Sequence, residues 1–297
     1  MNTNKTVLVT GGAGFVGTHL CRALLKKNYR VISLDNYFTG SKKNHLPNVE
    51  YRIGHTKDIL SLIPESVDWI FHLGEYSRVA PSVKEPDLVW DLNLQGTQGV
   101  LEYWRKYKGS KLIYAGSSTK FAHARNDGVI GKNMSPYSWS KAANTELIHN
   151  YGRWYNLPYS IAYFYNVYGP GERSGQFDGS YGTVIETFKQ CFLNKKACTI
   201  NGDGTQTRAF THVFDTVEAL LLMADKGVCD EYGISAQEVY SLLEVADMFG
   251  LEKEFSPATL STRSSGACDV SNLEKLGWRQ RYKLADYIKV IKEEAVK

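Results

Sequence analysis

Residues 6–17 read Thr6-Val-Leu-Val-Thr-Gly11-Gly-Ala-Gly14-Phe-Val-Gly17, an apolar run followed at once by glycines at positions 11, 14 and 17. The run predicts a buried strand, and the apolar spacing over about 14–27 predicts the helix that follows it. In such a turn Gly11 permits the tight bend, Gly14 lets a diphosphate approach the backbone, and Gly17 permits close packing of helix on strand. The N–H groups at the helix start favour phosphate. The stretch therefore predicts a dinucleotide-binding βαβ unit.

A second predicted strand, 30–34, leads into Asp35. A carboxylate at this place can accept hydrogen bonds from the adenosine ribose hydroxyls and repels a 2′-phosphate, so we expect NAD rather than NADP. Two alternatives stay open. Asp35 with Asn36 could simply open a turn, and Lys42 and Lys43 would suit a phosphate.

The rest of the chain extends this pattern. Further apolar runs at 68–73, 111–115 and 160–164 alternate with helical patterns at about 87–107 and 137–156, as in a parallel sheet built from βαβ units. After about residue 165, Gly/Pro-punctuated loops separate shorter elements. We therefore expect an α/β fold: a Rossmann doubly wound parallel sheet over 1–165, with some later segments returning to it, and a smaller C-terminal α+β substrate lobe mainly over 166–297.

Composition excludes several classes of protein. The formal net charge is +4, and we find no block of Lys and Arg typical of a nucleic-acid or membrane-surface patch. The five cysteines are scattered without a Cys-x-x-Cys spacing, which argues against a disulfide framework and against a metal site. No signal-peptide pattern and no run of about 20 apolar residues is found. We expect a cytoplasmic protein with no metal, no nucleic-acid partner and no membrane partner.

Catalytic groups are expected where a helix begins at Tyr137-Ser-Trp-Ser-Lys141. The i, i+4 spacing places the tyrosine and the lysine on one face of the helix. A phenol with a pKa near 10 is a poor base at neutral pH, and a neighbouring ammonium together with a nicotinamide cation would favour its ionised form. Ser117 follows the strand 111–115 at the edge where ligands of such sheets bind, and its hydroxyl can steady a reacting oxygen. The alternative is an ordinary surface Tyr–Lys pair.

Together with the later Tyr165-Asn-Val-Tyr-Gly-Pro170, these motifs resemble the extended short-chain dehydrogenase/reductase family, in its nucleotide-sugar epimerase/dehydratase branch. The resemblance covers nearly the whole chain. It implies NAD as cofactor, a nucleotide sugar as substrate, and Ser117, Tyr137 and Lys141 as the catalytic triad. In that triad Tyr137 is the base, and Lys141 also holds the nicotinamide ribose.

The same resemblance implies the remaining site residues. Cofactor contacts are expected at Gly11, Gly14, Phe15, Val16, Gly17, Asp35, Asn36, Asp58, Ile59, Leu73, Gly74, Asn93, Tyr137, Lys141 and Phe164. Substrate contacts are expected at Ser77, Ser118, Thr119, Asn166, Thr183, Arg208 and Arg263. Arg208 matches the arginine that clamps the substrate diphosphate, a task that suits the fixed fork of a guanidinium, although it could instead form an ion pair with Asp215.

The chain also departs from the family pattern. Ser117-Ser-Thr119 stands where 4,6-dehydratases carry Thr-Asp-Glu, so the acid and base needed to remove water are missing and dehydration is not expected. The distal Arg-x-Gly-Asp segment is absent, which leaves Arg263 poorly aligned as a phosphate contact. Glu75-Tyr-Ser-Arg78 is unlike the common epimerase sequence, and we interpret its two charges as an exposed salt bridge.

These features favour an NAD-dependent epimerase that oxidises sugar C4 and returns the hydride to the opposite face. Two other functions stay open: a nucleotide-sugar C4 dehydrogenase or reductase that releases or consumes the keto sugar, and a non-catalytic NAD-binding scaffold.

A homodimer through a four-helix bundle of the helices at about 87–107 and 137–156 is also expected, because members of the family commonly pair this way. The apolar residues proposed to supply it are Val89, Trp90, Val100, Leu101, Tyr103 and Trp104 on the first helix and Leu147, Ile148, Tyr151 and Trp154 on the second. The alternative is that the sheet-facing side of each helix absorbs them all.

Overall fold

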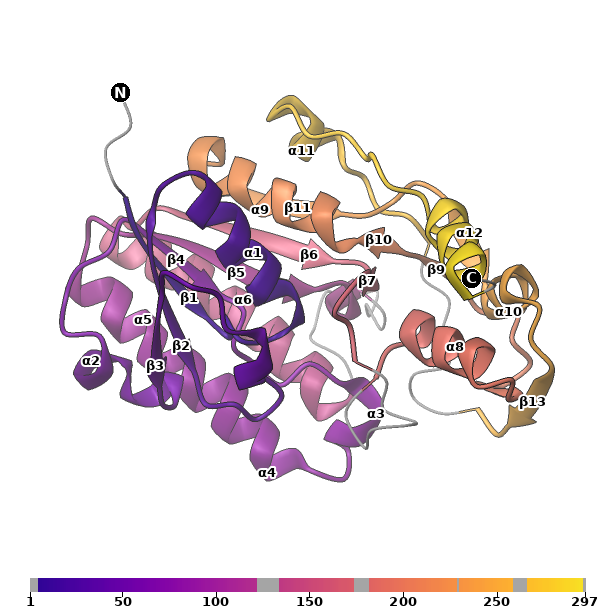
Figure 1. Ribbon diagram of the computed structural model, residues 1–297. Helices are drawn as coiled ribbons and strands as arrows, with labels where there is room; N and C mark the ends of the chain where they lie inside the picture. Colours follow the sequence, from indigo (N-terminus) through magenta and orange to yellow (C-terminus); the bar gives the residue numbers. More distant parts are fainter. Residues whose placement is uncertain (1–4, 122–133, 174–181, 229, 259–265, 296–297) are drawn as a thin grey trace. The chain divides into compact units, whose positions relative to one another are not determined.

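The computed structural model describes residues 5–121, 134–173, 182–228, 230–258 and 266–295. The chain divides into two compact units (Figure 1). The first, called here the nucleotide unit, comprises Met1–Tyr163 and Ala219–Tyr232. The second, the distal unit, comprises Phe164–Glu218 and Gly233–Lys297.

The nucleotide unit is built on a seven-stranded sheet of order β11-β6-β5-β4-β1-β2-β3. Pairing is parallel between β1 and β2, β1 and β4, β2 and β3, and β4 and β5. The expected doubly wound Rossmann sheet is therefore confirmed. Its strands are β1 (Thr6–Thr10), β2 (Arg30–Asp35), β3 (Val49–Ile53), β4 (Trp69–His72), β5 (Lys111–Ser117), β6 (Tyr159–Phe164) and β11 (Asp230–Ile234).

The central strands are apolar because both of their faces are covered. All four residues of β4 are buried, as are four of the five residues of β1. From β1 the sheet extends one way to β2 and the other way through β4 and β5 to β6. Because crossovers between parallel strands are right-handed, the β1–β2 connection, α1, lies on one face of the sheet, and the β4–β5 and β5–β6 connections lie on the other. The helices are α1 (Phe15–Lys26), α2 (Ile59–Leu62), α3 (Val79–Ser82), α4 (Pro86–Val89), α5 (Gly96–Lys106), α6 (Pro136–Tyr155) and α9 (Val213–Lys226).

Both long helices expected from the sequence are present. The first, expected at about 87–107, is α4 and α5 joined by the π-helical segment η3 (Trp90–Gln95). The second, expected at about 137–156, is α6, which has Ser135 as its N-cap and Pro136 in its first turn. The Ser135 hydroxyl accepts the Ser138 N–H at 3.1 Å, which fixes where α6 begins.

The strand order reverses between β1 and β4, and ligands of such sheets bind beyond the carboxyl ends of the strands at this reversal. The Thr10 hydroxyl accepts the N–H groups of Leu73 and Gly74 at 3.2 and 2.9 Å, so the loops after the two strands are tied together there. The glycine loop and the segment after β4 therefore lie side by side at the expected binding edge.

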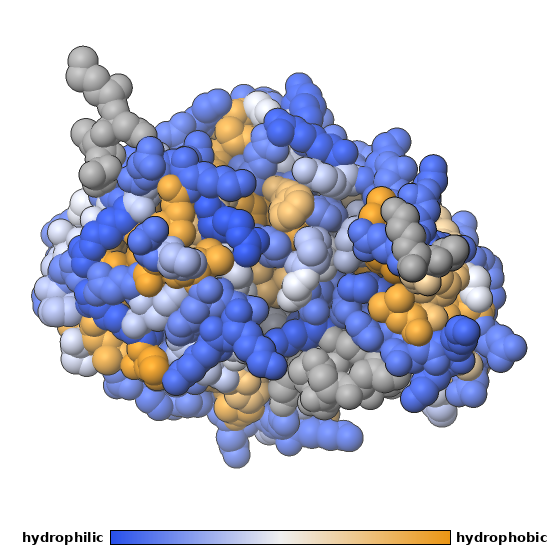
Figure 2. All heavy atoms as spheres, viewed as in Figure 1, coloured by the Kyte–Doolittle hydropathy of each residue, from blue (hydrophilic) through white to orange (hydrophobic). Residues whose placement is uncertain are grey.

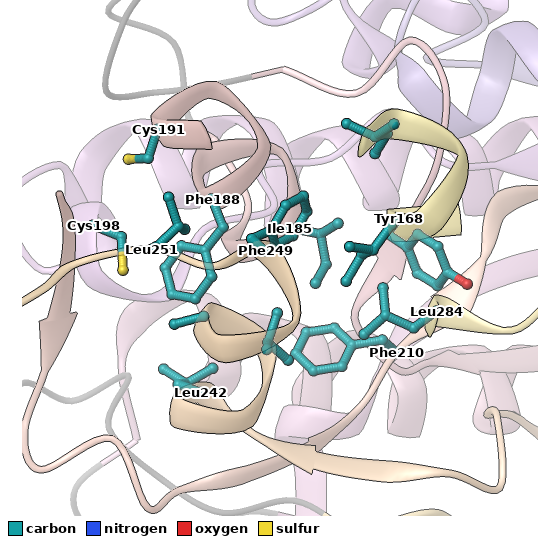
Figure 3. Packing of buried hydrophobic residues seen from close by; sticks show 14 of the residues in the cluster. Tyr168, Ile185, Phe188, Cys191, Cys198, Phe210, Leu242, Phe249, Leu251 and Leu284 are labelled. Atoms are coloured by element: carbon teal, nitrogen blue, oxygen red, sulfur yellow. The ribbon is translucent and has the colours of Figure 1, made fainter. Parts of the chain in front are cut away.

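The distal unit is a smaller α+β assembly, as expected. Its helices enclose an apolar core that includes Phe188, Phe249 and Leu284 (Figure 3). A capping box between Ser241 and Glu244 begins α10. Its strands are β7 (Val167–Tyr168), β8 (Cys198–Asn201), β9 (Thr207–Ala209), β10 (Thr211–His212), β12 (Val239–Ser241) and β13 (Lys253–Ser256), and its helices, besides the start of α9, are α8 (Val184–Leu193), α10 (Leu242–Phe249), α11 (Ser271–Lys275) and α12 (Leu284–Ala295).

Apolar side chains on the face drawn in Figure 2 lie in small groups among hydrophilic ones. Of the helices in the described parts of the chain, none has the length and apolar character needed to cross a bilayer.

Candidate active site

The glycine loop has the geometry that its spacing predicts. Gly11 has a φ of +73°, and a Cβ there would lie 2.8 Å from Gly74 Cα. A Cβ on Gly17 would lie 2.1 Å from the Gly11 carbonyl oxygen, so helix α1 can approach the loop this closely only without a side chain. A Cβ on Gly14 would meet just one atom within 4 Å, the Gly11 oxygen at 3.2 Å, and otherwise open space. Gly14 therefore leaves room for a ligand against the backbone.

Helix α1 begins beside this open space. Its N-cap, Gly14, supplies no side-chain hydrogen bond, so the helix start at Phe15 and Val16 is not capped by the residue before it. Thr18 binds the Gly14 carbonyl through its hydroxyl at 2.6 Å and fixes the loop from the helix side. A diphosphate fits here, because the helix N-terminus supplies N–H donors and a favourable dipole.

Asp35 is buried at the end of β2 and shapes the loop. One carboxylate oxygen accepts the Ala13 N–H at 2.9 Å, and the other accepts the Tyr37 N–H at 2.8 Å. The turn interpretation is therefore correct for part of its role. The contact of Asp35 with the ribose hydroxyls stays a prediction. Asn36 is exposed beside it and accepts the Phe38 N–H through its side chain.

The other expected cofactor positions differ in their exposure. Asp58 is exposed at the end of a 3-10 turn, Ile59 is buried at the start of α2, and Leu73 and Gly74 follow β4 half-buried. Asn93 is fully buried, and its side chain accepts the Tyr76 N–H at 2.7 Å and donates to the Ser140 hydroxyl at 2.9 Å. Asn93 thus holds the segment after β4 against α6. Phe164 is half-buried at the end of β6.

Ser117, Tyr137 and Lys141 come from adjoining elements of the nucleotide unit. Ser117 ends β5, and its hydroxyl oxygen lies 2.9 Å from that of Thr119 and accepts the Thr119 N–H at 3.2 Å. Tyr137 and Lys141 lie one turn apart in α6 and are 8% and 4% exposed. Lys141 donates to the Ala115 carbonyl at 2.6 Å, which ties α6 to β5 two residues before Ser117.

A carboxylate that we did not place in the site lies against the lysine. The Glu75 side chain is 1% exposed and forms an ion pair with Lys141. The interpretation of Glu75 and Arg78 as an exposed salt bridge was therefore wrong for Glu75: the residue that ends the β4 loop turns into the interior. A carboxylate directly after a buried strand, at the carboxyl edge of the sheet, was the available signal.

A chain of hydrogen bonds runs from β1 to this ion pair. His72 lies between two threonine hydroxyls, with Nδ1 2.8 Å from Thr10 Oγ1 and Nε2 2.9 Å from Thr97 Oγ1. The Thr97 hydroxyl donates to Glu75 at 2.9 Å, so His72 Nε2 carries the hydrogen in the bond to Thr97. Burial lowers the pKa of His72 to about 4, which agrees with this neutral ring.

Burial by itself would raise the pKa of Glu75, but the Lys141 ammonium outweighs it and holds that pKa below its usual value. Glu75 is therefore a carboxylate at neutral pH.

The expected substrate positions fall in both units. In the nucleotide unit Ser77 is exposed, and Ser118 and Thr119 are buried just after β5. In the distal unit Asn166 has a φ of +37° and donates to the Ala209 carbonyl at 2.8 Å. Thr183 is the N-cap residue of α8, and its hydroxyl donates to Glu172.

Arg208 lies on β9 and is 8% exposed. Asp215, its suggested alternative partner, accepts the backbone N–H groups of Arg281 and Tyr282. Arg263 lies outside the described residues.

Comparison with known proteins agrees with this geometry. Residues 7–234 match the NAD dependent epimerase/dehydratase family. A Methanocaldococcus jannaschii protein, named provisionally as a UDP-glucose 4-epimerase, is 33% identical over 95% of this chain and 96% of its own.

Two crystal structures are also similar. The UDP-glucose 4-epimerase of Thermotoga maritima, solved with UDP-glucose, has a TM-score of 0.88 and 25% identity over 98% of this chain and all of its own. The UDP-glucose 4-epimerase of Thermus thermophilus, solved with NAD, has a TM-score of 0.86 and 25% identity over 98% of this chain and 99% of its own. The chain belongs to the NAD-dependent epimerase/dehydratase family, and NAD is its cofactor.

Proposed function

We propose that this enzyme is a nucleotide-sugar 4-epimerase. The observation that carries the proposal is the hydrogen bond from Lys141 in α6 to the Ala115 carbonyl of β5, two residues before Ser117, in a unit whose glycine loop leaves room for a dinucleotide. Bound NAD would supply the hydride acceptor and donor for sugar C4. Tyr137 takes the proton of the C4 hydroxyl and gives it back, and Ser117 holds the reacting oxygen. Lys141 fixes the nicotinamide ribose through its remaining N–H.

Elimination is not favoured at this site. The two residues after Ser117 are Ser118 and Thr119, and both are buried hydroxyl side chains. Removal of water from a hexose needs an acid and a base beside C5 and C6, and neither hydroxyl ionises at neutral pH. The sugar is therefore expected to keep all of its oxygens during turnover.

UDP-glucose and UDP-galactose are the first substrates to test, because the relatives above are named for UDP-glucose. Purified protein is incubated with each, with and without added NAD, and the nucleotide sugars are separated by anion-exchange chromatography. Conversion of each sugar into the other, without accumulation of NADH, is the expected result. Accumulation of NADH with a keto product would instead support the dehydrogenase. No conversion in a panel extended to N-acetylated and GDP-linked sugars would contradict the proposal.

In the distal unit, Arg208, Asn166 and Thr183 are the proposed contacts to the substrate, with Arg208 binding the diphosphate. The planar guanidinium suits two phosphate oxygens at once. Arg263 is proposed for the same anion. The free cysteines of the described residues, Cys21, Cys191, Cys198 and Cys268, fit a reducing compartment, so a cytoplasmic location is proposed.

A homodimer through the long helices is proposed as well, with a changed set of contact residues. Trp104, expected at the interface, is fully buried and donates its indole N–H to the Ser110 carbonyl at 3.0 Å, so it belongs to the protomer's own core. Val89, Val100, Leu101 and Tyr103 are fully buried too. The apolar groups that remain exposed are on α6, where Trp139 is 41% and Trp154 is 62% exposed. These α6 tryptophans now carry the proposal.

Trp154→Glu tests the dimer. Light scattering at micromolar concentration is expected to give a dimer for the unchanged protein and a monomer for Trp154→Glu, because a charge would have to be buried in the bundle. Phe255→Glu is the matched control, since Phe255 is 58% exposed on β13 in the distal unit. A monomeric unchanged protein, or a dimer that survives Trp154→Glu, would contradict this interface.

A further inference from the structure

Glu75 is the buried ionised group nearest to the catalytic lysine, and the proposed reaction makes no use of it. Its carboxylate receives four donors from three elements of the nucleotide unit, α5, β5 and α6. One oxygen accepts the Thr97 hydroxyl at 2.9 Å, the Asn144 amide at 2.8 Å and the Tyr114 hydroxyl at 3.2 Å. The other accepts the Lys141 ammonium. These three donors occupy the lone pairs of the first oxygen, and the second oxygen keeps one acceptor position besides its bond to Lys141.

Burial excludes one role for Glu75. A general base must reach the substrate proton with a free lone pair, directly or through one water. The Glu75 side chain is 1% exposed and is held in an ion pair with Lys141, so a substrate proton does not come within reach of it. Its influence on the reaction must therefore pass through a neighbour, and Lys141 is the neighbour that belongs to the catalytic triad.

The lysine is correspondingly constrained. An ammonium has three N–H donors, and two of those of Lys141 go to Glu75 and the Ala115 carbonyl. Its nitrogen also lies 4.9 Å from the centre of the Tyr114 ring. One donor remains for a ligand. Because the ammonium and the carboxylate are in contact, their charges largely cancel at a distance, and groups around them experience a dipole rather than a full positive charge.

We propose that Glu75 is a positioning residue that aims the one remaining N–H of Lys141 at the cofactor and offsets the lysine's charge. This inference rests on the proposed role of Lys141, which the ion pair now makes more specific. In an enzyme that must bind NAD⁺ and NADH in turn, an unpaired lysine beside the nicotinamide would disfavour the oxidised form. The Glu75 carboxylate removes that bias.

The titratable groups around the pair allow a pH test. His72 faces it from β4, Tyr114 from β5, and Tyr137 from α6. The pKa of His72 is about 4, and burial raises that of Tyr114 well above its usual value, so neither ring ionises between pH 6 and pH 9. A change in the rising part of the pH–turnover curve in this range therefore reports on the Tyr137–Lys141–Glu75 group.

Glu75→Gln keeps the size of the side chain and removes its charge. The rising part of the curve of kcat against pH is expected to move to lower pH by at least about 0.5 unit, because an unopposed ammonium favours removal of the proton from Tyr137. The KM for the nucleotide sugar stays within about twofold, since Glu75 does not touch the substrate. Tyr114→Phe is the matched control: it deletes one neutral donor to Glu75, keeps the ring beneath Lys141, and leaves the curve in place. An unchanged curve in Glu75→Gln overturns the proposal.

Binding gives a readout that does not depend on turnover. Calorimetric titration is expected to show that Glu75→Gln weakens NAD⁺ at least about threefold more than NADH, because only the oxidised ring carries a positive charge. Equal effects on the two forms overturn the electrostatic part of the proposal, even if no sugar substrate is turned over. The test therefore remains valid if the proposed epimerase activity fails.

Glu75→Asp is the second variant, which keeps the test decisive if Glu75→Gln does not fold. It retains the charge and withdraws the carboxylate by one methylene. The expected result is a pH curve in the wild-type position with kcat lowered at least about fivefold, since the lysine follows the shorter side chain. Unchanged kcat in a folded Glu75→Asp enzyme shows that the lysine needs no such positioning and overturns the proposal.

Discussion

The glycine loop and the surroundings of Lys141, called here the lysine pocket, lie at the carboxyl edge of the same sheet. The shape of the first depends on backbone, and the shape of the second depends on side chains. The loop is shaped by backbone: Gly11 and Gly17 allow contacts that a single Cβ would forbid, and Gly14 leaves space open. The pocket around Lys141 is shaped by buried side chains, with Glu75 and Asn144 joining β4, α5 and α6. The glycines of the loop leave room for a diphosphate, whereas the side chains around Lys141 set the charge and direction of one ammonium.

The two regions are also connected. Thr10 ends the strand that precedes the glycine loop, and the chain through His72 and Thr97 leads from it to Glu75. Because each hydroxyl has a single hydrogen, the direction of each bond in this chain is fixed by its neighbours. A change at one end is therefore felt as a lost or reversed hydrogen bond at the other.

Tyr137→Phe tests whether catalysis and NAD binding depend on different regions, and it should have the largest effect on turnover. We expect a loss of turnover of at least about 10²-fold, because the group that transfers the proton is deleted. NAD affinity, which depends on the loop, should stay within about threefold, and the melting temperature should hardly change. Steady-state kinetics and calorimetric titration measure the two effects. Turnover close to that of the unchanged enzyme would contradict the assigned chemistry.

This contrast also explains what the sequence could predict. The loop glycines, Asp35 and the Tyr137–Lys141 spacing are local patterns, so their geometry follows from neighbours within one strand, turn or helix. Glu75 and Lys141 are 66 positions apart, and their contact depends on how β4, β5 and α6 pack. The face of a helix is equally hard to assign, because apolar period alone does not say which side packs on the sheet. Trp104 was placed at an interface for that reason.

Lowering the pH tests the hydrogen-bonded chain through His72 that connects the two regions. Its expected effect, on stability, is smaller than the effect of Tyr137→Phe on turnover. The pKa of His72 is lowered to about 4 from 6.5, so the unfolded chain binds more protons than the folded one between these values. The stabilisation from neutral His72 is complete above pH 6.5 and is lost as the pH falls toward 4. It amounts to at most roughly 3 kcal/mol of unfolding free energy. The pKa of Glu75 lies below its usual value, so acid protonates it at a lower pH than an ordinary glutamate.

Urea unfolding at several pH values between 4.5 and 7.5 measures the slope of the unfolding free energy against pH. His72→Asn, which removes the titrating ring, is expected to flatten it while lowering stability at neutral pH. A slope that is the same in the variant would show that other groups cause the acid sensitivity.

The smallest expected effect concerns the loop and distinguishes charge from shape at Asp35. Its carboxylate both repels a 2′-phosphate and accepts the Ala13 and Tyr37 N–H groups. Asp35→Asn removes the charge and keeps one acceptor, and Asp35→Ala removes both functions. The preference for NAD over NADP, measured as a ratio of dissociation constants, should fall about tenfold in both variants, because the repulsion is lost in each.

Only Asp35→Ala should also weaken NAD itself through a loosened loop and lower the melting temperature by a few degrees. If Asp35→Asn retains the full preference, then Asp35 acts through the turn alone, and selectivity must come from elsewhere in the loop. If both variants lose the preference and stability alike, charge and shape cannot be separated at this position, and the loop depends on side chains as much as the lysine pocket does.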